Sequence, residues 1–303
     1  MTDNECRNLL KNRLIRYRNN LNLPKDVTFG IEIEYENIVK DTVSHLLDEE
    51  AYFNSKFRGW TNTTEISLSE YNSLSEEMNG EIDSPILNDD IITWKNLKTA
   101  LELLSKNGAV ITQRCGGHIN IGTHILGNKP EYWRNFFLLW LLYEKEIYKF
   151  SKGEYNKIRF DKEKLFRKIS SELLIEDVMD IDKDFYLLSL PYCVYDKFHD
   201  VYLNRFVKES VIAGNRIEFR IPNGTLNEEI WQNYINFFTK FLLACKKELD
   251  IEETIYKINN KEHSAIELAN FIFDEEIDKE NFLIQTLKTN KIYKKELPEH
   301  IKY

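Results

Sequence analysis

The sequence predicts an α+β fold built on a mostly antiparallel sheet and followed by a helical C-terminal extension. Several segments alternate strictly between apolar and polar residues, as strands do, and the helical segments between them follow no regular β-α-β rhythm. The 303 residues are 42% hydrophobic and 13% aromatic, which is enough to bury a large core. We therefore expect one main domain over residues 1–249 and a helical extension over residues 250–303 that packs on it.

Apolar spacing and prolines define the elements of the first third of the chain. Residues 3–20 predict an amphipathic helix that closes before Pro24, residues 27–36 predict a strand, and residues 41–50 predict a short helix. A polar, turn-rich stretch follows at residues 54–70. Residues 81–87 predict a short strand, which Pro85 either places at a sheet edge or ends.

The later elements are mainly helices. Residues 90–106 predict a helix that Asp90 caps and Gly108 follows. The other segments are a strand at 109–122, helices at 130–149 and 161–174, extended segments at 185–195 and 216–221, and a helix that Asn227 caps and that reaches about residue 249.

Charge and hydropathy argue against several classes of partner. With 41 basic and 50 acidic residues the formal net charge is -9, which disfavours a nucleic-acid-binding surface as the main function. The longest aromatic and aliphatic run, residues 136–143, is far shorter than the roughly 20 residues of a membrane span. The N-terminus resembles no secretory signal, and the four cysteines form no CxxC pair. We expect a cytoplasmic protein without membrane or nucleic-acid partners; no self-complementary patch predicts its oligomeric state.

The first chemically informative segment is the strand at residues 30–36. Alternation places Glu32, Glu34 and Glu36 on one face, about 6.5 to 7 Å apart along the strand, opposite an apolar face. A solvated face of an edge strand is the simpler interpretation. Three neighbouring carboxylates repel one another, however, and a divalent cation relieves that repulsion because hard cations bind carboxylate oxygens.

Two further strands carry polar residues in the same way. Residues 117–122 place His118 and Asn120 on one face, and residues 216–221 place Arg216, Glu218 and Arg220 together. Taken singly, a histidine is more often structural, and an R-x-E-x-R row is more often a surface salt-bridge ladder. Together, carboxylates, an imidazole and guanidiniums are the groups that bind metal-bridged phosphates. Residues 81–85 add Glu81 at a bend before a proline.

In this order the segments resemble the amidoligase family, the carboxylate–amine ligases related to glutamine synthetase and glutamate–cysteine ligase. No single motif is specific, but their order and spacing over residues 28–230 are. The family motifs are a G-x-E-x-E strand, a D-G-S-L-like stretch, an E-x-x-S-P turn, a G-x-H-x-H strand, and an E-F-R strand followed by G-T-L; they correspond to residues 30–34, 65–68, 81–85, 116–120, 218–220 and 224–226.

Two positions depart from the family pattern. Glu65 stands where the D-G-S-L stretch has aspartate, which keeps the charge on a longer arm. Asn120 replaces the second histidine of G-x-H-x-H, and an asparagine can hydrogen-bond to a nucleotide but carries no charge.

The resemblance implies a sheet of the glutamine synthetase and glutamate–cysteine ligase type with helices packed on one side. It also implies an ATP-dependent ligase that joins a small-molecule or peptide carboxylate to an amine through an acyl phosphate, with Mg²⁺ or Mn²⁺ as cofactor. Catalytic roles fall to Glu34, Glu218 and Arg220. By motif, Glu32, His118 and Glu218 hold one ion, and Glu34, Glu81 and Glu65 hold the second. By the same resemblance, Arg220 contacts the transferred phosphoryl group and Asn120 contacts the nucleotide. Either Arg216 or Arg114 contacts the nucleotide phosphates or the substrate carboxylate.

Two other functions remain open on the sequence. One is a phosphotransferase that keeps the ATP and metals of this fold, and the other is a non-catalytic relative that binds a small molecule or a protein. Retention of the acidic, histidine and arginine residues argues against the second. Trp60 is a pocket wall or a packing residue, and Asn204 a substrate contact or a turn residue.

Overall fold

A six-stranded antiparallel sheet forms the centre of the molecule. The computed structural model describes residues 2–65, 78–112, 114–127, 129–155, 168–181, 200–202 and 216–287. The strand order is β2-β3-β1-β4-β6-β5, and every pairing is antiparallel, as the sequence predicts. The strands are β1 (Phe29–Glu36), β2 (Thr61–Thr63), β3 (Asn79–Asp83), β4 (Gly117–Gly122), β5 (Val201–Tyr202) and β6 (Arg216–Phe219).

The strand register gives the sheet one apolar and one polar face. Residues paired across neighbouring strands lie on the same face. The pairs Ile33↔Ile82, Ile31↔Ile119 and Ile119↔Phe219 build the apolar face, and the pairs Glu34↔Glu81, Glu32↔His118 and Asn120↔Glu218 build the polar face.

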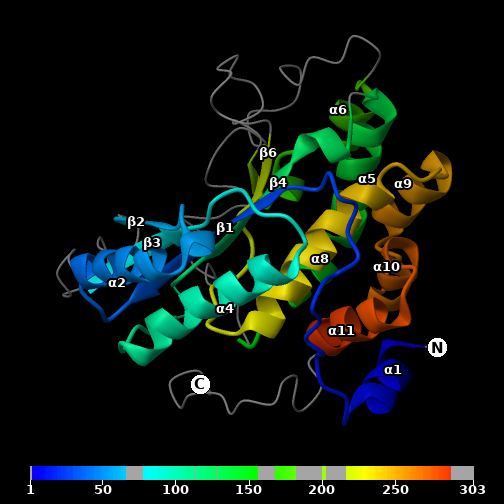
Figure 1. Cartoon of the computed structure of the whole chain (residues 1–303). Helices are drawn as coiled ribbons and strands as arrows, with labels where there is room; N and C mark the ends of the chain where they lie inside the picture. Colours follow the sequence, from blue (N-terminus) through cyan, green and yellow to red (C-terminus); the bar gives the residue numbers. More distant parts are fainter. Residues whose placement is uncertain are drawn as a thin grey trace.

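Helices cover the apolar face (Figure 1). Trp94 of α4 stacks on Phe29 with ring centroids 5.7 Å apart, and Phe238 of α8 stacks on Phe219 at 4.4 Å. Trp140 of α5 also stacks on Phe219, at 5.8 Å. The α-helices are α1 (Asp3–Leu10), α2 (Lys40–Phe53), α4 (Ile91–Lys106), α5 (Pro130–Ser151), α6 (Ile175–Met179), α8 (Glu228–Ala244), α9 (Ile251–Asn260), α10 (Ala265–Ile272) and α11 (Glu276–Leu287), and the 3-10 helices are η1 (Ser55–Phe57), η3 (Thr123–Ile125) and η4 (Ile169–Ser171).

Helix starts follow the predicted capping chemistry in part. The Asp90 carboxylate accepts hydrogen bonds from the backbone N–H groups of Ile92 and Thr93, which caps α4. Gly108, with φ of +86°, follows the end of this helix. Asn227 occupies the N-cap position of α8, but its side chain makes no capping hydrogen bond, and the helix ends at Ala244 rather than near residue 249.

The predicted helix over residues 3–20 is wrong beyond Leu10, where α1 ends. Two side-chain amides bind the backbone that follows. The Gln232 side chain accepts from the Arg18 N–H at 2.9 Å and donates to the Arg18 C=O at 2.7 Å. Asn281 binds the Arg16 N–H and C=O in the same way, at 3.0 and 3.1 Å. These tertiary bonds satisfy backbone groups that a helix would otherwise pair internally.

Other strand predictions need correction in their bounds. β3 ends before Pro85 and lies between β2 and β1, so the proline ends the strand and does not mark an edge. Among the described residues of the strand expected at 109–122, only Gly117–Gly122 form a strand, β4, and Val110 makes an isolated bridge to Glu36. The turn-rich stretch at 54–70 contains the short strand β2.

Two predicted elements fall partly or wholly outside the described residues. The extended segment at 185–195 lies outside them, as do residues 161–167 of the helix expected at 161–174. Within the described part of that helix, residues 168–174 contain the 3-10 helix η4 and no α-helix.

The C-terminal segment forms α9, α10 and α11, which pack against α5, α8 and α1. Residues 288–303 lie outside the described part, and the division at residue 249 stays a prediction.

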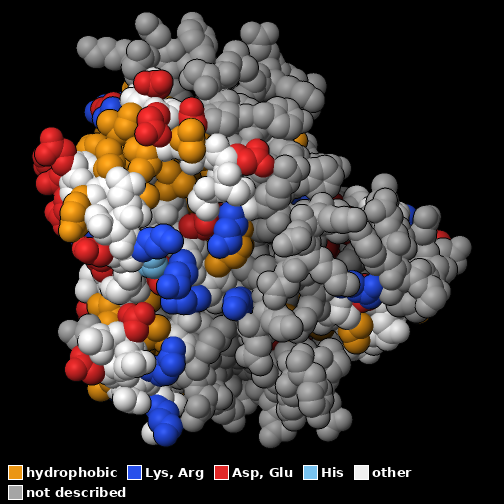
Figure 2. Space-filling model, turned by 180° about the vertical axis from the view of Figure 1, so that it is seen from behind, with side chains coloured by type: hydrophobic (Ala, Val, Ile, Leu, Met, Phe, Trp, Pro, Cys, Tyr) orange, Lys and Arg blue, Asp and Glu red, His pale blue; other side chains and the backbone are white. Residues whose placement is uncertain are grey.

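On the face seen from behind, Lys and Arg side chains gather in a band, with acidic side chains along the outer edge (Figure 2). No helix among the described residues has the length and apolar character needed to cross a membrane.

Candidate functional site

His118 lies at the centre of the polar face of the sheet. Its Nδ1 atom is 2.8 Å from Glu32 Oε2, and its Nε2 atom is 3.4 Å from Glu34 Oε1. Oxygens of Glu81 and Glu218 each lie 3.8 Å from Nδ1. Side chains from β1, β3 and β6 therefore converge on one imidazole of β4, of which only 2% is exposed.

Backbone and amide groups orient two of these carboxylates. The Gly116 N–H donates to Glu34 Oε2 at 2.6 Å, and the Asn120 side chain donates to Glu32 Oε1 at 2.8 Å. Gly117 permits close helix packing on the other face, because a Cβ atom there would lie 2.8 Å from the Trp231 ring. Strand β4, which carries His118, therefore contacts the β1 carboxylates on the polar face and packs closely against Trp231 of α8 on the apolar face.

Burial and mutual repulsion raise the pKa values of two carboxyl groups near His118. Burial, followed by the charges of Glu32 and Glu34, raises the pKa of Glu81 to about 10. Burial, followed by the charge of Glu32, raises the pKa of Asp83 to about 6. A proton or a cation relieves such repulsion, and a divalent cation relieves it for several carboxylates at once.

Two sets of side chains can each hold a metal ion. Glu32, Glu81 and His118 form one set, and Glu34, Glu65 and Glu81 form the other; within each set the ligand atoms lie within 4.8 Å of one another. The second set contains the three residues that the family resemblance assigns to one ion. The first set differs from the expectation, because Glu81 replaces Glu218. Carboxylates with one imidazole suit Mg²⁺ or Mn²⁺.

Glu218 is bound to Arg220 instead, through the Arg220 Nη1 atom. Arg216 at the start of β6 and Arg220 just after its end each have a buried Nε donor that makes no hydrogen bond among the described residues. The buried acceptor Asn120 Oδ1 makes none there either. Buried donors without partners are costly, and an anion such as a phosphate can satisfy them. The site therefore has an acidic centre and an adjacent group of unsatisfied arginine donors.

Arg114 lies apart from Arg216, although the sequence offered either one for the same role. Its Nη2 atom is 2.6 Å from Glu36 Oε1 at the end of β1, whereas Arg216 pairs with Gly122, beside Thr28 at the start of that strand. From Thr28 to Glu36 the chain covers roughly 26 Å at the usual rise of a strand. The backbone positions of the two arginines therefore lie toward opposite ends of β1, although the charge of Arg216 also acts on Asp83, which is paired with Glu32.

Sequence reasoning missed Asp200, which supports Arg220. The Asp200 carboxylate is fully buried and accepts hydrogen bonds from Trp140 Nε1, Tyr148 OH and the Ile169 N–H at 3.3, 3.2 and 3.1 Å. Its backbone C=O accepts from the Arg220 N–H at 2.9 Å. Burial raises its pKa well above the usual value. No short motif marks this aspartate, because its partners are distant in sequence.

Sequence reasoning also missed Asp83, Asn79 and Glu36 as site residues. Asn79 and Asp83 alternate with Glu81 on β3, so the period of two that placed the other carboxylates on one face also applies to them. Glu36 was assigned to the acidic face but given no role. Of the weaker candidates, Trp60 is buried and stacks on Phe57 at 5.6 Å, and Asn204 lies outside the described residues.

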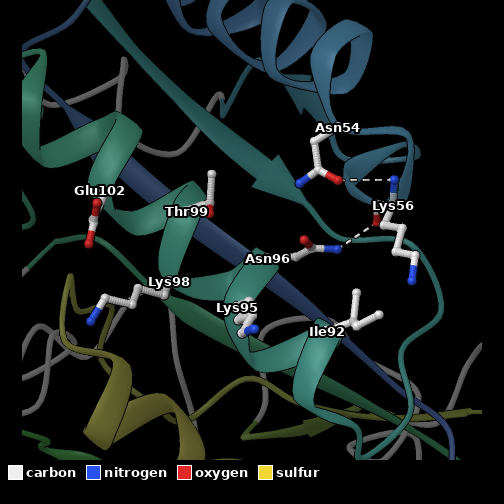
Figure 3. A pocket seen from close by; sticks show the side chains of 8 residues that line it. All are labelled: Asn54, Lys56, Ile92, Lys95, Asn96, Lys98, Thr99 and Glu102. Carbon is white, nitrogen blue, oxygen red and sulfur yellow. Dashed lines mark hydrogen bonds between the residues drawn. The ribbon is translucent and has the colours of Figure 1, made fainter.

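A pocket of about 460 Å³ lies away from these residues, between η1 and α4 (Figure 3). Its lining contains no predicted site residue. It is formed by Asn54, Lys56, Ile92, Lys95, Asn96, Lys98, Thr99 and Glu102.

Comparison with known proteins gives one family match. A family model described as "Putative amidoligase enzyme" matches residues 25–242. A solved structure described as "Apo GmaS without ligand" matches with 12% identity and a TM-score of 0.38; the match covers 86% of this chain and 65% of that one, so this chain spans less than two thirds of its length. No curated protein matches the chain.

Proposed function

Since the chain belongs to the amidoligase family, we propose that it is an ATP- and Mg²⁺-dependent ligase that joins a carboxylate to an amine. The observation that carries the proposal is the convergence of Glu32, Glu34, Glu81 and Glu218 on His118 from three neighbouring strands. A surface salt-bridge ladder would not bury a carboxylate such as Glu34, which is 1% exposed, against like charges.

The ligand sets suit two divalent ions. Glu32, Glu81 and His118 would hold one, and Glu34, Glu65 and Glu81 would hold the other. Bound there, Mg²⁺ or Mn²⁺ would neutralise phosphate oxygens during transfer. Both sets share Glu81, whose pKa is raised to about 10 by burial and by the charges of Glu32 and Glu34, so a bound cation would take the place of a proton at this carboxyl group.

The arginine donors suit the phosphates of ATP. The unpartnered Nε atoms of Arg216 and Arg220 can donate to phosphate oxygens, and the Asn120 amide lies on the strand between them and Glu32. Glu218 holds the Arg220 side chain, and Asp200 binds its backbone N–H, so the guanidinium is oriented before substrate arrives.

The reaction follows two displacements. A substrate carboxylate oxygen attacks the γ-phosphorus and ADP leaves, which gives an acyl phosphate. The amine nitrogen then attacks the acyl carbon, the C–O bond to phosphate breaks, and the nitrogen loses a proton as the amide forms. The sheet that supports this chemistry is, on this proposal, of the glutamine synthetase and glutamate–cysteine ligase type.

The test is a screen of carboxylate and amine pairs for ADP formation with Mg²⁺, followed by mass spectrometry of the product. We expect ADP and an amide only when both partners are present. ADP formation and a phosphorylated acceptor without any amine would instead indicate a phosphotransferase. Absence of nucleotide binding in the presence of Mg²⁺ would indicate a non-catalytic relative.

A further inference from the structure

A third group of polar side chains lies at the end of the polar face, beyond the metal-ligand sets. Arg114 and Glu36 form an ion pair of 2.6 Å in which the Glu36 side chain is 2% exposed and the Arg114 side chain 38%. Asn79 is paired directly with Glu36 across β1 and β3, so the two side chains share one face. The group thus has a buried inner part and an arginine that solutes can reach.

Within the described part of the chain, the buried Asn79 amide has no hydrogen-bond partner. Its side chain is 2% exposed, and neither Oδ1 nor Nδ2 makes a hydrogen bond. Leaving a buried amide unsatisfied costs free energy, and nearly all buried polar side chains in proteins are paired. An amide that offers both N–H donors and a carbonyl acceptor beside a carboxylate and a guanidinium is a typical arrangement for holding a polar ligand.

The position of this group separates it from the phosphates. Arg114 is at the opposite end of β1 from Arg216, whereas Glu36 is only two residues from Glu34, about 7 Å along the strand. A molecule held by Glu36, Asn79 and Arg114 can therefore place a reactive group at the second metal-ligand set. It cannot at the same time fill the place of the nucleotide.

We propose that Glu36, Asn79 and Arg114 form a recognition site for the zwitterionic end of a substrate, an ammonium and a carboxylate on one carbon, as in an α-amino acid. This assignment rests on the proposed ligase function for its catalytic meaning. The Arg114 guanidinium binds the carboxylate, the Glu36 carboxylate binds the ammonium, and the Asn79 amide hydrogen-bonds to the same end. The opposite charges of the ion pair match those of the ligand.

The test measures binding without nucleotide, so that it does not depend on turnover. The full-length protein with Mg²⁺ is titrated by calorimetry with the common L-amino acids, each in free, N-acetyl and C-amide form. We expect at least one free amino acid to bind more tightly than both of its blocked forms. In Arg114→Gln that amino acid binds roughly 10- to 100-fold more weakly, while its C-amide form is unaffected. Glu36→Gln should have the corresponding effect on the ammonium, and Asn79→Leu should weaken binding of the free form.

Arg16→Gln is the matched control, because it also removes an Arg–Glu ion pair of 2.6 Å, but one on the N-terminal segment. If Glu36→Gln does not fold, Arg114→Gln and Asn79→Leu decide the question. The proposal is overturned if no free amino acid binds the wild type, or if blocked forms bind equally well. Charge-selective binding with no ADP formed from any substrate pair would reject the ligase function and leave this recognition site standing.

Discussion

Glu34 on β1 is paired directly with Glu81 on the neighbouring strand β3, so that two carboxylates lie side by side on one face of the sheet. Like charges in that position are destabilising unless something neutralises them. The pair lies at the junction of the two metal-ligand sets, since Glu81 belongs to both and Glu34 to one.

Glu34→Gln and Glu218→Gln should each abolish Mg²⁺-dependent ATP turnover while the fold stays intact. The first removes a proposed metal ligand, and the second removes the carboxylate that binds the Arg220 guanidinium. Turnover is measured as ADP release, and folding by circular dichroism. Glu102→Gln, on the exposed face of α4, serves as the control. Normal turnover in both variants would show that the assignment is wrong.

Glu81→Gln should remove most of the stabilisation that Mg²⁺ confers. A ligand that binds only the folded state stabilises it by RT ln(1 + L/Kd), where L is the ligand concentration, so the Tm rises with the logarithm of L once the site is mostly filled. The wild-type Tm should therefore rise with added Mg²⁺ and fall again with a chelator, whereas the variant should respond weakly because both ligand sets lose a member. The measurement is a thermal melt over a Mg²⁺ series; an equal rise in both proteins would contradict the shared-ligand role.

Arg220→Lys should lower the rate of ATP turnover by about 10-fold or more. A lysine ammonium is a point charge and cannot bind Glu218 and a phosphate with the planar geometry of a guanidinium. Steady-state kinetics should show the loss mainly in kcat, because the proposed contact of Arg220 is with the phosphoryl group that is transferred. Arg16→Lys, on an exposed ion pair, should leave the rate unchanged.

Asp200→Asn should flatten the pH dependence of stability. Burial raises the pKa of Asp200 above its usual value near 3.8, so its protonated form favours the folded state. That contribution is complete below the unfolded pKa and is lost as the pH rises toward the folded pKa. Urea unfolding at pH 5 and pH 8 should show a larger loss of stability at the higher pH in the wild type than in the variant. Parallel curves would contradict the prediction.

Asp278→Ala should lower the free energy of unfolding by about 3–5 kcal/mol, the usual cost of breaking a buried ion pair. Asp278 of α11 is fully buried, and its carboxylate binds Arg18 of the N-terminal segment at 2.6 Å as well as Lys240 of α8. Urea unfolding measures the loss. Glu280→Ala removes a more exposed partner of Arg16 and should cost less than about 1 kcal/mol.

The polar face of the sheet could be predicted from the sequence because a strand has a period of exactly two. Alternation alone placed Glu32, Glu34 and Glu218 on polar faces, and the register then aligned those faces. The pairing of strands could not be read in this way. Glu81 meant little as a single acidic residue, and only its register opposite Glu34 puts it in both ligand sets.

Two errors have different physical causes. The helix expected to residue 20 ends at Leu10 because the Gln232 and Asn281 amides bind the backbone of Arg16 and Arg18. Such tertiary hydrogen bonds override local propensity. β2 was missed because Thr61–Thr63 is a three-residue strand in a polar stretch, where no apolar alternation can mark it.

The separation of Arg114 and Arg216 along β1 gives the reaction surface a direction. On the proposed function, a substrate that is recognised at Glu36 and reacts with a nucleotide bound near Arg216 would extend along β1. The distance from the recognised end of the substrate to its reacting carboxylate would then be selected together with its charge. Shortening or lengthening the substrate by a single methylene would shift the reacting atoms relative to Glu34 and Glu81.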